Sequence, residues 1–83
     1  MSDAIDVCIK VLNERRRQRK LYVEGKITHR CEDPTVTSGH KLSVLTEEVG
    51  EVARALNDNE PKENLKAELI QVAAVAVAWA ESL

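Results

Sequence analysis

The chain has 83 residues, a formal net charge of −2, two cysteines, no Phe, one Tyr and one Trp. A chain of this length forms one small domain, residues 1–83, that buries only about two thirds of its unfolded surface, so Leu, Val, Ile and Ala must supply its core. The negative charge and the scarcity of aromatic rings for base stacking argue against a dedicated nucleic-acid-binding protein.

The first predicted element is an N-terminal helix over residues 1–22. Ser2 can cap this helix, and Asp3 lies in its first turn, where the helix dipole favours an acid. Three apolar residues share one side of it: Ile5, Cys8 and Leu12. We expect that side to face the core.

Positive charge is concentrated in this N-terminal part of the chain. Up to Arg30 the basic residues exceed the acidic ones by eight to four, whereas from Cys31 onward the acids exceed the bases by ten to four. The charge distribution is therefore lopsided. Basic residues near the end of a helix complement its dipole, so the basic run by itself identifies no ligand.

Residues 23–40 are predicted as a loop with little periodicity, and three residues in it disfavour regular structure: Gly25, Pro34 and Gly39. Tyr22, just before the loop, is expected to pack on the helices rather than stack on a base. His29 and Cys31 have the spacing of a soft-metal pair, but no second pair accompanies them, so we interpret them as ordinary loop residues. His40 is interpreted as a helix-start residue rather than a general base.

A helical hairpin is predicted over residues 41–83. Apolar residues at alternating steps of three and four mark its first helix: Leu42, Leu45, Val49, Val52 and Leu56. Asn57 to Asn59 supply turn chemistry, and Pro61 suits the first turn of the second helix, which runs to the C-terminus. A turn centred between residues 59 and 60 places Glu51 opposite Glu68, and Glu48 opposite Gln71.

Four carboxylates therefore gather at one height of the hairpin: Glu47, Glu48, Glu51 and Glu68. Their repulsion costs a few tenths of a kcal/mol per exposed pair and more where water is excluded. Glu68 shares a face with apolar residues and needs a cationic partner. Oxygen ligands at this density suit Mg²⁺ or Mn²⁺. A solvated acidic face is the alternative interpretation for Glu47 and Glu51.

The pattern Glu47-Glu48-x-x-Glu51, followed by Glu68 in Glu-x-x-Gln, resembles the EExxE…ExxD signature of the MazG-like all-α nucleoside triphosphate pyrophosphohydrolases. The strings KLSVLTEEVGEVARAL and AELIQVAAVAVAWAESL, with ERRRQRK at residues 14–20, are similar to the small MazG-like proteins of phage and mobile-element type. The likeness covers most of the chain and is weakest between residues 21 and 39.

This resemblance implies Mg²⁺-dependent hydrolysis of a ribo- or deoxynucleoside triphosphate to the monophosphate and pyrophosphate, with Mn²⁺ as an alternative metal. The four glutamates would bind the metal or orient the attacking water. The residues that would bind the substrate phosphates are Arg15, Arg17, Gln18, Lys41 and Arg54. Gln71 stands where the family has Asp, and an amide is a weaker ligand for a hard cation. Two alternatives stay open: a catalytically impaired nucleotide-binding relative, and a non-enzymatic helical-bundle interaction module.

The second hairpin helix also predicts self-association, because residues 72–80 are all apolar and offer more surface than two partner helices can cover. We expect an all-α fold, a helical hairpin plus an N-terminal helix, in which a homodimer or homotetramer completes a four-helix-bundle core. The resemblance implies the same assembly. The apolar run is too short to span a bilayer. Without a signal peptide or lipidation motif, and with Cys8 and Cys31 predicted as free thiols, we expect a cytoplasmic protein.

Overall fold

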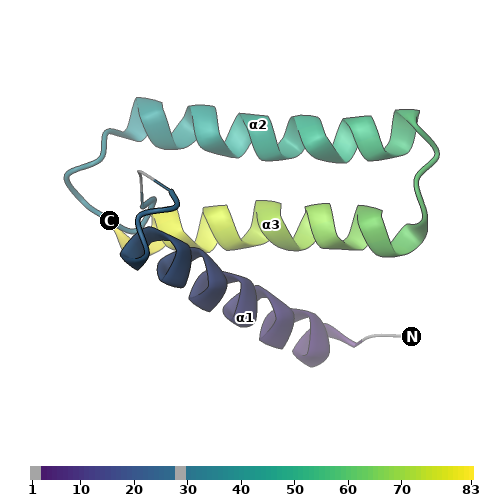
Figure 1. The fold of residues 1–83 in the computed structure, drawn as a ribbon, viewed down its shortest axis with the longest axis horizontal. Helices are drawn as coiled ribbons and strands as arrows, with labels where there is room; N and C mark the ends of the chain where they lie inside the picture. The colour runs from purple at the N-terminus through teal and green to yellow at the C-terminus, as the bar shows by residue number, and fades with distance from the viewer. Residues whose placement is uncertain (1–2, 28–29) are drawn as a thin grey trace.

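The computed structural model describes residues 3–27 and 30–83, and all regular structure in that part of the chain is helical. The helices are α1 (Ala4–Val23), α2 (Ser38–Asn57) and α3 (Lys62–Glu81). α2 and α3 run antiparallel, while α1 crosses α3 obliquely (Figure 1). α3 is the central helix, since both other helices pack against it. The prediction of an all-α fold is confirmed.

Side chains and backbone turns define both ends of α1. Its N-cap is Asp3, whose carboxylate accepts a hydrogen bond from the Asp6 N–H at 2.8 Å. Ser2, the predicted cap, lies outside the described residues. After the helix, Gly25 adopts a φ of 74°, and the N–H of Lys26 reaches back to the Leu21 carbonyl at 2.8 Å. This is a Schellman turn, which favours glycine at the left-handed position.

Local hydrogen bonds also set the bounds of α2. The Thr37 hydroxyl accepts from the His40 N–H at 3.1 Å, so α2 begins at Ser38 rather than Lys41, and His40 lies in its first turn. At the other end Asn59 has a φ of 52°, and the Glu60 N–H donates to the carbonyl five residues earlier at 3.0 Å. Asn tolerates this left-handed conformation better than most residues, which explains how so short a turn reverses the chain.

The core consists of small side chains. Its buried apolar residues are Val11, Cys31, Ala55, Ala74, Val75 and Ala78. Cys31 comes from the loop after α1 and packs against Val75 and Ala78 of α3. Burial raises the pKa of the Cys31 thiol. Cys31 is therefore a core residue, whereas Cys8 is an exposed free thiol; His29 lies outside the described residues.

Large apolar side chains remain uncovered on all three helices. The side of α1 predicted to face the core instead faces solvent, with Ile5 71% and Leu12 53% exposed, because Val11 lies on the side that is buried. On α2 the exposed apolar residues recur every seven positions, at Leu42, Val49 and Leu56. On α3, Leu69 and Val77 are exposed. Exposed apolar surface of this extent on a small domain is typical of a site that contacts a partner.

In the described part of the chain, every helix is too short or too polar to cross a membrane.

Candidate functional site

The acidic cluster is centred on Glu48 of α2. Oxygen Oε2 of Glu48 is buried and has no hydrogen-bond partner among the described residues. Burial raises the pKa of Glu48, and nearby carboxylates raise it further; in order of effect they are Glu68, Glu51, Glu14 and Glu47. The structure therefore brings the other three sequence-predicted glutamates within electrostatic range of Glu48. The buried, unpartnered oxygen of Glu48 has lost its water, which makes the charge of this carboxylate costly.

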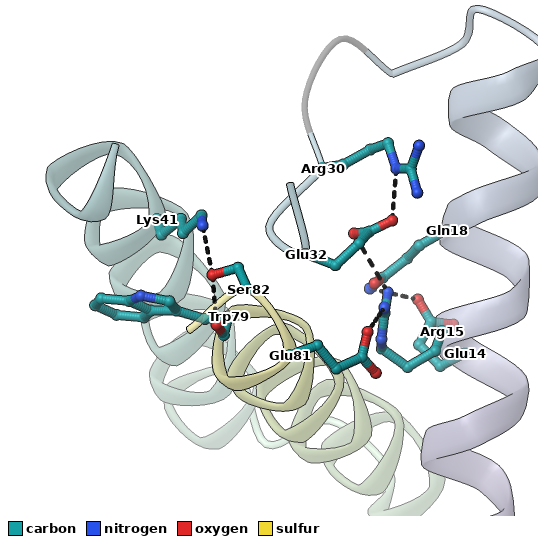
Figure 2. Close-up of polar contacts among 9 residues, drawn as sticks. All are labelled: Glu14, Arg15, Gln18, Arg30, Glu32, Lys41, Trp79, Glu81 and Ser82. Carbon is teal, nitrogen blue, oxygen red and sulfur yellow. Dashed lines mark hydrogen bonds and ion pairs between the residues drawn. The ribbon is translucent and has the colours of Figure 1, made fainter. Parts of the chain in front are cut away.

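Glu14 is a fifth carboxylate, which the sequence analysis did not single out. It comes from α1, its side chain is only 12% exposed, and it accepts two hydrogen bonds from Arg17, at 2.7 and 2.6 Å. Gln18 donates a third at 3.2 Å (Figure 2). The spacing of these residues, three and four positions apart on one helix, was visible in the sequence. The sequence did not show that Glu14 lies near Glu48, because this approach depends on how α1 packs on the hairpin.

The donor atoms have mixed suitability for a divalent cation. Within residues 3–27 and 30–83, no three or more His, Cys, Asp or Glu side chains converge closely enough to hold a metal ion. Glu47 is exposed, and Glu51 forms an ion pair with Arg54. By chemistry the cluster fits a hard cation, because its donors are carboxylate oxygens and the buried Glu48 oxygen lacks any partner.

A cavity of about 170 Å³ adjoins the acidic cluster, since Glu48 and Gln71 both line it. Three guanidinium-bearing residues border it: Arg17, Arg19 and Arg30. Val44 and Val75 form part of its apolar lining, and the amide of Gln18 also borders it. The cavity therefore combines apolar surface, amide groups and cations, in a volume smaller than the roughly 300–1,000 Å³ of pockets that enclose a whole small-molecule ligand. Gln71 and Glu48, which the predicted register places opposite each other, thus border the same cavity from α3 and α2.

The predicted phosphate-binding residues divide into two groups. Arg17 and Gln18 line the cavity. Arg15, Lys41 and Arg54 are held in other contacts. Arg54 is paired with an acidic side chain of its own helix, α2. Lys41 is 2% exposed and donates to the hydroxyl of Ser82 at 2.7 Å.

Arg15 connects three parts of the fold. Its guanidinium lies 2.7 Å from Glu81 at the end of α3 and 3.6 Å from Glu32 in the loop (Figure 2). The Arg15 side chain is 13% exposed, and its Nε is buried without a hydrogen-bond partner. These contacts hold α1 against the C-terminal end of α3. Arg15 therefore acts as a structural link in this arrangement.

The loop presents Arg30 to the cavity through a similar set of contacts. Arg30 donates to Glu32 at 2.5 Å, and its guanidinium lies 5.0 Å from the ring centre of Tyr22. Burial opposes ionisation of Glu32, but hydrogen bonds from Arg30 and from the backbone outweigh it and lower the pKa of that carboxyl. Tyr22 thus packs beneath a cation, where it supports Arg30.

Comparison of the chain with protein-family models, with curated proteins and with solved structures finds no match. The features of the chain that indicate its function are therefore the acidic cluster, the cavity beside it and the motif spacing.

Proposed function

We propose that this chain is a Mg²⁺-dependent nucleoside triphosphate pyrophosphohydrolase of the MazG-like kind, releasing the monophosphate and pyrophosphate, with Mn²⁺ as an alternative metal. One observation carries the proposal: the Glu48 carboxylate is partly buried, lacks a partner at Oε2 and is surrounded by four other carboxylates. An arrangement that is so costly by itself becomes favourable when a divalent cation is present.

The residues of the chain would have distinct tasks in this reaction. Glu48, Glu51 and Glu68 would hold the metal with Glu47, and Gln71 would add a weak oxygen ligand. The ion, when bound, neutralises phosphate charge and acidifies its water. Arg17 borders the cavity beside Glu48 and would bind a phosphate through its exposed edge, since its side chain is 53% exposed. Glu14 would keep that guanidinium in position.

Specific observations support two alternatives. Gln71 lines the cavity at the position where the family has Asp, which favours a nucleotide-binding relative with impaired catalysis. The uncovered apolar residues of all three helices favour a helical-bundle interaction module.

The same uncovered residues support a homodimer or homotetramer with a four-helix core, in which the stripe Leu42, Val49 and Leu56 is covered by a second copy. Solution mass tests this: the native chain should run as a dimer or tetramer, and Val49→Glu should dissociate it. A monomeric native chain would remove the oligomer from the proposal. A cytoplasmic location stays a prediction.

The decisive experiment for function is pyrophosphate release from a panel of ribo- and deoxynucleoside triphosphates with Mg²⁺ or Mn²⁺. The native chain is compared with Glu48→Gln, with Gln71→Asp, and with Glu24→Gln as a control outside the cluster. Release that is lost only in Glu48→Gln supports the enzyme. Release only from Gln71→Asp identifies the impaired relative. Silence from every variant favours the interaction module.

A further inference from the structure

Three exposed apolar residues of α1 form a stripe along the helix, which we call the α1 stripe: Ile5, Ile9 and Leu12. They follow one another at steps of four and three, the spacing that places side chains on one face of a helix. Each of them is at least half exposed, whereas Val11, on the other side of α1, is buried. The α1 stripe therefore faces away from α3, on which α1 packs, and the described part of the chain leaves it uncovered.

The charges beside the α1 stripe have opposite signs at its two ends. Asp6 lies in the first turn of α1 and is exposed. It is within electrostatic range of Lys66, and an exposed carboxylate can accept a second cation as well. Arg16 follows Leu12 by one turn, is also exposed, and donates to the side-chain oxygen of Asn13 in its own helix at 3.5 Å. The stripe thus begins beside an acid and ends at a base.

These two ends match when two copies of α1 lie antiparallel. If Ile9 of one copy lies beside Leu12 of the other, Arg16 of each copy lies at the height of Ile5 of the other, one residue from Asp6. Apolar side chains then meet in the middle, and the symmetry of the contact lets a base meet an acid at both ends. A parallel pairing would instead bring Arg16 against Arg16. Charge complementarity therefore selects a second copy in the antiparallel direction.

A lipid surface fits the same residues less well. An anionic membrane would attract Arg16 but would repel Asp3 and Asp6 at the other end of the helix. Helices that lie in a membrane interface commonly insert aromatic side chains beside their aliphatic ones. The aromatic residue of α1 is Tyr22, and its ring packs beneath Arg30. The α1 stripe therefore favours a protein partner.

We propose that the α1 stripe is a self-association surface, covered by the antiparallel α1 of a second copy of this chain. This contact is separate from the contact proposed for α2, because α1 packs on α3 and, in the described part of the chain, its backbone does not approach that of α2. Figure 1 shows α1 and α2 on different sides of α3. A chain with two separate two-fold contacts assembles as a dimer of dimers. The α1 contact does not require that the chain hydrolyses nucleotides.

Solution mass tests the α1 contact, measured by sedimentation velocity on the full chain over a range of concentrations. The variants are Leu12→Glu on the α1 stripe, Val49→Glu on α2, and both together. Lys62→Glu is the control, because it introduces the same side chain at an exposed position of α3. We expect a tetramer for the native chain and the control, a dimer for each single variant and a monomer for the double variant. An unchanged mass in Leu12→Glu, or an equal loss in the control, would overturn the α1 contact.

A second pair of variants tests the antiparallel arrangement by charge. Arg16→Glu brings an acid against Asp6 of the second copy and should weaken association through α1, whereas Arg16→Lys keeps the charge and should associate like the native chain. Arg16 is exposed and bonds within its own helix, so these variants remain informative if Leu12→Glu folds poorly. Equal association by the two variants would refute the antiparallel pairing.

Cys8 reports whether α1 itself forms the contact. It is an exposed thiol one position before Ile9, whereas Cys31 is buried. A short bis-maleimide should join two copies through Cys8 in dilute native chain, and it should fail to do so in Cys8→Ser and in Leu12→Glu. An oligomeric native chain that gives no link through Cys8 would place the contact on another helix.

Two further measurements separate this contact from a membrane site and from the proposed activity. A native monomer that sediments with vesicles of equal parts phosphatidylcholine and phosphatidylserine, and loses this binding as Leu12→Glu, would assign the stripe to a membrane and overturn the proposal. Pyrophosphate release is assayed on the same variants. Hydrolysis by a native chain whose mass does not respond to Leu12→Glu refutes the α1 contact but not the enzyme. Association through α1, in a chain that hydrolyses no nucleotide, supports the contact and refutes the enzyme.

Discussion

Replacing Glu48 with Gln should stabilise the chain when no metal is present. Burial and four neighbouring carboxylates raise the pKa of Glu48. Each like-charge contact costs a few tenths of a kcal/mol, so the neutral Gln side chain should stabilise the fold by about 1 kcal/mol in total. For a domain of this size, that corresponds to a rise of about 4–8 °C in melting temperature. The assay is thermal or urea unfolding in chelator at neutral pH, with Glu24→Gln as the control.

The raised pKa of Glu48 determines whether the free energy of unfolding rises or falls with pH. Between the ordinary carboxyl value of 4.5 and the raised value, the folded chain keeps a proton that the unfolded chain has lost. Native stability therefore falls as pH rises through that window, and the penalty is complete above it. The advantage of Glu48→Gln should be greatest at neutral pH and should disappear below about pH 4.5.

Added Mg²⁺ should reverse the order of stability, because the ion stabilises the native cluster and does less for the variant. Two results would refute the reasoning. A variant that is less stable than the native chain in chelator would mean that Glu48 has a stabilising partner. An advantage that is independent of pH would mean that its charge is not the cause.

Three further outcomes are expected. Arg15→Ala should lower the free energy of unfolding by about 1–2 kcal/mol in urea titrations, since it breaks a partly buried link between α1, the loop and α3; an unchanged midpoint would contradict this. Gln71→Asp should tighten Mg²⁺ binding in calorimetry, because a carboxylate replaces an amide, and an unchanged affinity would place the metal elsewhere. A thiol reagent should label Cys8 in the folded chain and reach Cys31 only after unfolding; equal rates would mean that the core opens readily.

Much of the fold was predictable because its signals are local. The apolar spacing between Leu42 and Leu56 depends only on helix periodicity. The turn at Asn59 depends on one residue that tolerates a positive φ. Together they fix the register, which explains why Glu48 and Gln71, predicted to lie opposite each other, line the same cavity.

The remaining features depend on packing between distant parts of the chain. α1 has apolar residues on more than one side, and the side with Val11 is buried while the side with Ile5 and Leu12 is not. The burial of Cys31 and Lys41, and the approach of Glu14 to Glu48, follow from how α1 and the loop pack on the hairpin. Neither periodicity nor motif spacing carries that information, so Glu14 was missed.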